Sequence, residues 1–147
     1  MIIVDSHPRS AVYYYKASRK GGAVEISLTN READLMEVLW ERGASTVSEV
    51  RDFLNDELAY TTVLTILRTL EDKGYVDHRE EGRAHRYSAT VSRDIARKSA
   101  LKALSHKLFK GSTELLLTHL VTDEKLTDDE ILRIRRLLDR PAKGRES

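Results

Sequence analysis

The sequence predicts a mainly α-helical chain with one small β-hairpin, organised in two successive parts. Apolar residues recur at helical spacing along most of the chain, and three capping boxes mark helix starts. One short region instead alternates apolar and polar residues on both sides of a glycine, as a hairpin does. At 147 residues, 40% hydrophobic and 33% charged, the composition is that of a globular protein.

Composition also excludes several classes of protein. The chain has no cysteine, which removes disulfides, thiolate metal sites and cysteine nucleophiles and favours a cytoplasmic location. No apolar run approaches the roughly 18–20 residues that a transmembrane helix needs, so we expect no direct membrane association. The apolar residues 1–4 are followed at once by charged ones, so no signal peptide is expected.

Residues 1–25 differ from the rest of the chain. Three tyrosines at 13–15 precede Lys16, Arg19, Lys20 and two glycines, without a sustained periodicity. One interpretation is a flexible N-terminal leader, and the other is a basic arm that lies along phosphates or in a minor groove.

Three helices and then a hairpin are predicted for residues 26–90. The first helix starts at the capping box of Thr29 and Glu32, and the second at that of Thr46 and Glu49. The third covers residues 59–73, and a hairpin follows with strands at 75–79 and 84–89. This order is that of a winged helix-turn-helix, in which the second and third helices form the helix-turn-helix and the hairpin is the wing.

Residues 91–140 are predicted to be helical, with a third capping box at Thr127 and Glu130, and residues 141–147 to form a tail. A unit of about 50 residues rarely buries enough apolar surface alone, so we expect a dimerisation domain with two-fold symmetry. The residues expected at its interface are Leu101, Leu104, Leu108, Leu115, Leu116, Leu120, Ile131, Ile134 and Leu138.

The charge distribution restricts how this chain could bind DNA. Residues 26–90 carry eight Lys and Arg against thirteen Asp and Glu, a net charge of −5, so contact must rely on a few positioned groups. No acidic residue occurs from 58 to 70, which suits a helix face turned to phosphates. The residues expected to contact DNA are Tyr60, Thr61, Thr62, Thr65 and Arg68 on the third helix, and Arg83, His85 and Arg86 among the basic residues of the wing, which also include Arg79. Alternation places Tyr87 on the packing side.

Other interpretations remain open at this point. The threonines could fill a neutral solvent face, the wing could be an ordinary charged hairpin, and the net charge of −5 would suit a winged-helix module that binds only proteins. The five histidines show no metal-ligand spacing, and no nucleophile elbow, phosphate loop or dinucleotide fingerprint occurs. We therefore expect no enzyme, no metal and no cofactor.

Residues 59–76 resemble the recognition helix of the BlaI/MecI/CopY family of penicillinase-type repressors, and residues 82–87 resemble its wing. Residues 107–111 and 126–130 look like its dimerisation domain. The resemblance covers residues 26–140. It implies a homodimer that represses transcription from a pseudo-palindromic operator in double-stranded DNA. By similarity, Thr61, Thr62, Thr65, Arg83 and Arg86 would contact that DNA.

The resemblance also implies release by a membrane-bound sensor metalloprotease that cuts the tail, here near Ala103 and Leu104. The Asn-Phe pair usual at that cut is absent from this chain. The cysteines of the copper-responsive branch are absent too, which excludes copper sensing by thiolates. Leu64 occupies a position where some relatives have a basic residue. We therefore expect this turn of the recognition helix to recognise DNA bases less strongly or differently.

Overall fold

The computed structural model describes residues 25–55 and 57–141. These form two compact units, one extending to Ala103 and one starting at Leu104. The predicted leader, apart from Glu25, and the tail, apart from Pro141, lie outside the described residues. The predicted domain boundary at residues 90 and 91 stays a prediction.

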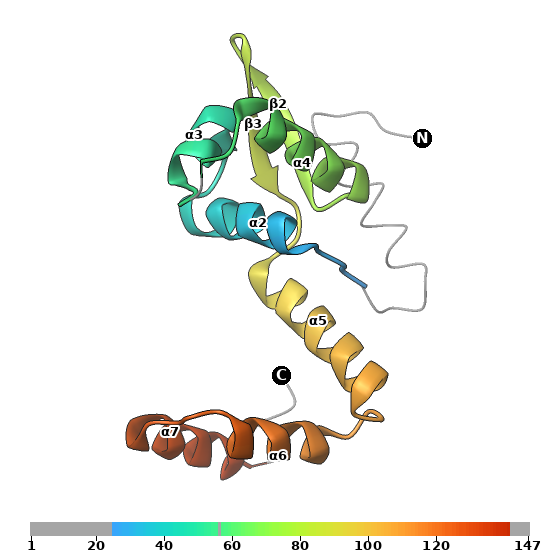
Figure 1. The fold of residues 1–147 in the computed structure, drawn as a ribbon, viewed down its shortest axis with the longest axis vertical. Coiled ribbons are helices and arrows are strands. Elements are labelled where there is room, and N and C mark those ends of the chain that lie inside the picture. Colours follow the sequence, from blue (N-terminus) through green and yellow to red (C-terminus); the bar gives the residue numbers. More distant parts are fainter. Residues whose placement is uncertain (1–24, 56, 142–147) are drawn as a thin grey trace. The chain divides into compact units, whose positions relative to one another are not determined.

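The first unit contains helices α2 (Asn30–Arg42), α3 (Val47–Phe53) and α4 (Tyr60–Lys73), and it ends in the first part of α5 (Arg93–Leu108). Its strands are β1 (Ser45–Thr46), β2 (Val76–Glu81) and β3 (Ala84–Ala89). Figure 1 shows α3 and α4 side by side, with the hairpin of β2 and β3 projecting past them. The predicted winged helix-turn-helix is confirmed.

The three strands form an antiparallel sheet in the order β1-β3-β2, so β3 is the central strand. Glu81 pairs with Ala84, which leaves a turn of only Gly82 and Arg83, and Gly82 adopts a φ of 63°. The predicted turn at residues 80–83 was therefore two residues too long. The two-residue strand β1 was not predicted, because a pair of residues carries no periodicity.

The core of the first unit joins all three helices to the sheet. Its buried members are Leu35, Met36, Val38 and Leu39 of α2, Val47 and Val50 of α3, Val63, Leu67 and Leu70 of α4, and Val76 and Tyr87 of the hairpin. The Tyr87 residue is only 1% exposed, which confirms its predicted packing role. The Trp40 side chain packs against this core and donates a hydrogen bond of 2.8 Å from Nε1 to the Val91 carbonyl.

Both predicted capping boxes of this unit are present. In α2 the Thr29 hydroxyl accepts from the Glu32 amide at 3.2 Å, and Glu32 Oε1 accepts from the Thr29 amide at 2.9 Å. The same Glu32 oxygen lies 2.7 Å from Lys73 Nζ at the end of α4. Burial alone would raise the pKa of Glu32, but the bonds from Lys73 and Thr29 outweigh it and lower the pKa below its ordinary value.

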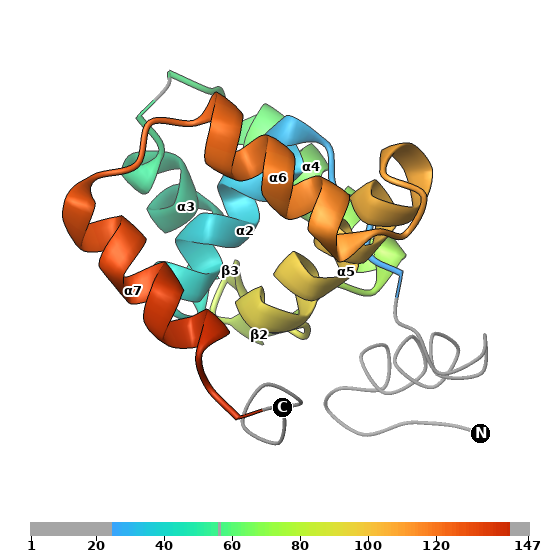
Figure 2. The same cartoon turned by 90° about the horizontal axis from the view of Figure 1, so that it is seen from below.

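The second unit consists of the last turns of α5 together with α6 (Thr113–Asp123) and α7 (Asp128–Leu138). The third capping box is present: the Thr127 hydroxyl accepts from the Glu130 amide at 3.1 Å, and Glu130 returns the bond at 2.9 Å. Figure 2 shows α6 and α7 running in different directions from the loop that joins them. Little apolar surface is buried: Leu116, at 9% exposed, is the one buried hydrophobic residue among those described here.

We expect Glu32→Ala to destabilise the protein by about 1–3 kcal/mol, since one substitution removes both a capping partner and a half-buried ion pair. The folded-state pKa of Glu32 is lowered, so its stabilisation is fully present above the unfolded pKa of about 4.3 and is lost as pH falls through the lower folded value. Urea unfolding at pH 7 and at pH 3 measures the difference. Asp34→Ala, which removes an exposed carboxylate, is the control and should change stability by less than about 0.5 kcal/mol. A Glu32→Ala effect that is equal at both pH values would contradict the assignment.

Candidate nucleic-acid interface

The α4 helix has two sharply different sides. The buried Val63, Leu67 and Leu70 face the core. The opposite side of the helix carries only polar, exposed residues over its first three turns: Thr61, Thr62, Thr65, Arg68 and Thr69. These include four of the five predicted DNA-contacting residues of this helix. The fifth, Tyr60, is 42% exposed and stands at the first helical position.

Two threonine hydroxyls on this exposed side are bonded to the helix itself. Thr65 donates to the Thr61 carbonyl at 2.9 Å, and Thr69 donates to the Thr65 carbonyl at 3.0 Å. With the proton used in this way, each hydroxyl oxygen can still accept a hydrogen bond, and each side chain keeps its methyl group. The pattern suits contact with base amino groups and with thymine methyl groups.

The N-terminus of α4 is built differently from those of α2 and α3. Its N-cap is Ala59, which provides no side-chain hydrogen bond, and its first turn contains no acidic residue. The N-termini of α2 and α3 are each capped by a capping box of one threonine and one glutamate. The first amides of α4 therefore lack a side-chain acceptor, and the positive end of the helix dipole is not compensated by a carboxylate, which favours an anion there.

The wing places its basic residues in different surroundings. Arg83 in the turn and Arg79 on β2 are exposed, and no ion pair to either is recorded within the described part of the chain. His85 is half-buried, and its ring stacks on that of His78 with the centroids 4.4 Å apart. His78 in turn lies 2.6 Å from the Glu71 carboxylate of α4. His85 thus belongs to a contact between the wing and α4.

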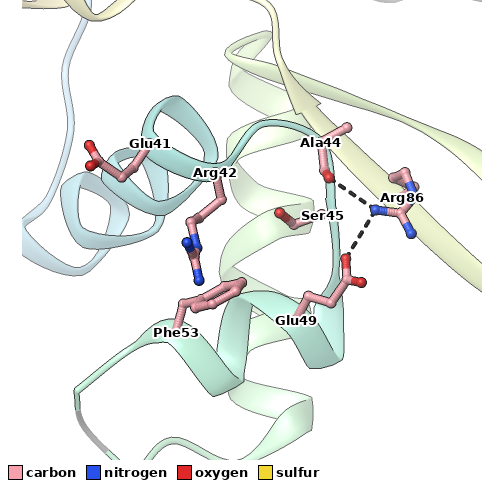
Figure 3. A pocket seen from close by; sticks show the side chains of 7 residues that line it. All are labelled: Glu41, Arg42, Ala44, Ser45, Glu49, Phe53 and Arg86. Carbon is pink, nitrogen blue, oxygen red and sulfur yellow. Dashed lines mark hydrogen bonds and ion pairs between the residues drawn. The ribbon is translucent and has the colours of Figure 1, made fainter.

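Arg86 differs from the other wing arginines because its guanidinium is bonded to four acceptor oxygens from three residues. Its Nε and Nη2 bond the two Glu81 carboxylate oxygens at 3.1 and 2.7 Å. Its Nη1 bonds Glu49 Oε1 at 3.0 Å and the Ala44 carbonyl at 2.9 Å, as Figure 3 shows. Arg86 is among the DNA contacts expected from the sequence. Its three partner residues could not be predicted, because they become its neighbours only in the folded protein.

The ion pairs of Arg86 also shift the titration of the groups involved. The Thr46 amide of the capping box, followed by Arg86, lowers the pKa of Glu49. Arg86 is the main cause that lowers the pKa of Glu81, and the Glu81 hydrogen bond in turn raises the pKa of Arg86. All three groups are therefore charged at neutral pH.

A hollow of about 400 Å³ lies beside Arg86 (Figure 3). Opposite charges line it, and the Arg42 guanidinium carbon sits 3.6 Å from the centroid of the Phe53 ring. The lining residues are Glu41, Arg42, Ala44, Ser45, Glu49, Phe53 and Arg86. Among residues 25–55 and 57–141 no group of three or more His, Asp or Glu side chains is arranged to hold a metal ion.

The second unit leaves many of the predicted interface residues uncovered. The exposed ones are Leu101 at the end of the first unit, and Leu104, Leu108, Leu115, Leu120 and Leu138. Ile131 and Ile134 are half-buried, whereas Leu116 is buried, with 9% of its surface exposed. Ala103 and Leu104, the predicted cleavage position, are both exposed and lie within the helix α5. No helix in the described part of the chain is long and apolar enough to span a bilayer.

The second helix of the helix-turn-helix exposes no acidic side chain over its first three turns, and the wing carries exposed arginines. These features are typical of the class of nucleic-acid-binding winged-helix proteins. Residues 28–140 match the family described as penicillinase repressor. The chain belongs to this family, as the sequence resemblance predicted.

Two curated relatives, BlaI and MecI, agree with this assignment. The chain is 36% identical over 115 residues to the transcriptional regulator BlaI of Mycobacterium tuberculosis, with 76% of this chain and 82% of the relative covered. It is 21% identical to the methicillin resistance regulatory protein MecI of Staphylococcus aureus, with 77% and 94% covered. A solved MarR family protein from Bacillus stearothermophilus aligns with a TM-score of 0.45 and 16% identity, covering 88% of this chain and 79% of its own. BlaI is named as a transcriptional regulator and MecI as a regulatory protein.

Proposed function

We propose that this protein is a cytoplasmic transcriptional repressor that binds a pseudo-palindromic operator as a homodimer. The observation that carries the proposal is the exposed side of α4, which holds threonines and an arginine but no acid over its first three turns, beside a helix N-terminus without a capping side chain. Family membership supports it, since the relatives are transcriptional regulators.

In this proposal α4 is the recognition helix. Thr61, Thr62 and Thr65 contact base edges, with Arg68 as the cation of the same face. The exposed arginines of the wing, Arg79 and Arg83, bind phosphates or enter the minor groove. Tyr60 lies at the start of the helix, where its side chain can reach the sugar-phosphate backbone of the DNA. His85 and Arg86 are left out of the contacting set, because other groups of the protein already hold them.

The net negative charge of residues 26–90 is compatible with DNA binding because several of the acidic side chains are paired with cations within the protein. Glu37 and Glu41 of α2 share Arg93, at 2.9 and 3.1 Å. Glu32 pairs with Lys73. A small number of phosphate contacts then gives a moderate salt dependence.

Dimerisation through α5, α6 and α7 is supported by the apolar residues that the second unit leaves exposed, with Leu108 at 67%. Such a surface is unfavourable in water and is covered when a second copy packs against it. Leu116 is left out of the proposed interface, because only 9% of it is exposed in the single chain.

Release of the repressor by a membrane-bound sensor metalloprotease is a further part of the proposal. Cleavage between Ala103 and Leu104 would separate the DNA-binding unit from most of the dimerisation surface. Both residues lie within α5, so the helix must open locally before a protease can cut it.

The proposal is tested by fluorescence anisotropy of the full chain on the DNA upstream of its own gene, against a scrambled duplex, at several salt concentrations. We expect tight binding to the upstream DNA and weak binding to the scramble. Arg83→Ala should weaken binding to both duplexes and reduce the magnitude of the log–log salt slope by about 0.9, the value for one lost phosphate contact. No sequence-selective binding at any salt concentration would favour the alternative, a winged-helix module that binds proteins.

A second prediction separates helix stability from DNA affinity. Ala59→Asp adds an N-cap to α4 and should stabilise the protein by about 0.5–2 kcal/mol in urea unfolding. The same carboxylate would lie at the helix end proposed to meet phosphate, so the affinity for the upstream DNA should fall by about tenfold or more. Ala59→Ser is the matched control: it caps the helix without charge and should stabilise the protein while retaining the affinity. Equal affinities of the two variants would refute the proposed docking of this helix end.

A third prediction concerns the dimer. Leu108→Asp places a charge on the exposed leucine side of α5 and should convert the dimer into monomer in analytical ultracentrifugation at micromolar concentration, because the buried carboxylate would have no partner. Ala103→Asp introduces the same charge on another side of the same helix and should remain dimeric. The interface assignment would be wrong if Leu108→Asp stayed dimeric.

A further inference from the structure

The contacts of the Arg86 side chain indicate how the wing can bind a negatively charged partner. We propose that Arg86 promotes DNA binding as a positioning residue that acts through Glu81 and Glu49, by neutralising their carboxylates, and that it makes no phosphate contact of its own. This inference rests on the proposed DNA-binding function.

The donors of Arg86 are almost fully used within the protein. A guanidinium has five N–H groups, and four of those of Arg86 are bonded to Glu81, Glu49 and the Ala44 carbonyl. The Arg86 side chain is only 20% exposed. A phosphate would have to displace a bidentate carboxylate pair, which is among the strongest hydrogen-bonded arrangements in proteins.

The partners of Arg86 come from three places in the fold. Ala44 belongs to the segment between α2 and β1, Glu49 to the first turn of α3, and Glu81 to the end of β2. Glu49 Oε1 also accepts from the Thr46 amide at 3.0 Å, so the same oxygen caps α3 and holds Arg86. Arg86 therefore links the wing to the start of the helix-turn-helix (Figure 3).

The position of Glu81 makes its charge important. It directly precedes the turn of Gly82 and Arg83, so an unpaired carboxylate there would stand beside the arginine proposed to hold phosphate. The side chains of Glu81 and Glu49 are 51% and 46% exposed, and their charges reach the solvent where DNA would lie. Removing Arg86 leaves the Glu49 and Glu81 carboxylates at the base and the tip of the wing without their hydrogen-bonded cation. Glu81 then keeps only the weaker electrostatic interaction with Arg79, so the repulsion of phosphates by both carboxylates increases.

The decisive comparison uses Arg86→Ala alone and combined with Glu81→Gln, in the full-length chain bound to the upstream DNA. Arg86→Ala should weaken binding about tenfold, because it removes the cation that neutralises the two carboxylates. The double variant has the net charge of the wild-type chain. It should bind within about threefold of the wild type and with the wild-type salt slope.

The matched control is Arg83→Ala with and without Glu81→Gln. If Arg83 holds phosphate, Glu81→Gln cannot restore the contact, and the salt slope should stay reduced by about 0.9 in both variants. The wild-type chain and the Arg83→Ala variants thus test the DNA-binding function itself. The Arg86→Ala variants, with and without Glu81→Gln, test the role of the ion pairs. Wild-type chain that fails to select the upstream DNA would overturn both proposals.

A persistent loss of affinity in the Arg86→Ala/Glu81→Gln variant would overturn the inference. A salt slope reduced by about 0.9 would then identify Arg86 as a phosphate contact, and an unchanged slope would identify a purely structural link. Thermal unfolding of each variant shows whether it is folded at the assay temperature. If Arg86→Ala alone is unfolded, the comparison of the double variant with the wild type still decides between these outcomes.

Discussion

The arrangement of the first unit depends on β3, the central strand of the three-stranded sheet. It pairs with β1 on one side, at the entrance to α3, and with β2 on the other, within the wing. Successive side chains of a strand point to opposite faces, so neighbouring residues of β3 can make different contacts. Tyr87 is buried in the core, His85 stacks towards the His78–Glu71 contact with α4, and Arg86 bonds Glu49 of α3. One strand thereby connects the wing to both helices of the helix-turn-helix.

The second constraint is that residues 26–90, in which acidic residues outnumber basic ones, have to present a surface without acidic residues. The glutamates of α2 and α3 are used at helix starts and in ion pairs: Glu32 and Glu49 complete capping boxes, and each also holds a cation. α4 lacks such a box, and it exposes no acidic side chain over its first three turns. Glutamate thus stabilises the starts of two helices and is absent from the first three turns of the third, a distribution that net charge alone does not reveal.

Much of the fold could be predicted from the sequence because it is specified locally. Each capping box joins residues three apart, and Val63, Leu67 and Leu70 follow helical spacing, so these features needed no knowledge of tertiary contacts. Strand β1 escaped prediction because its pairing with β3 joins Ser45 to Tyr87, far apart in the chain. The surroundings of Arg86 were missed for the same reason, although a two-residue turn would have placed Glu81 and Arg86 on one face of the hairpin. The alternation of the wing gave the side of Tyr87 correctly, since that depends only on period two.

The wing shows why the number of arginines in a sequence does not give the number of phosphate contacts. Arg79, Arg83 and Arg86 have the same charge and lie within eight residues, but only Arg86 is bonded to two carboxylates and a carbonyl. A guanidinium whose donors are filled acts on a distant anion chiefly through the net charge of its cluster, and here that cluster contains two glutamates and one arginine. Arg83, in the turn, can instead offer its donors directly. The residues that a basic motif contributes to binding are thus decided by their acidic neighbours in space, which only the register of the hairpin and the position of α3 reveal.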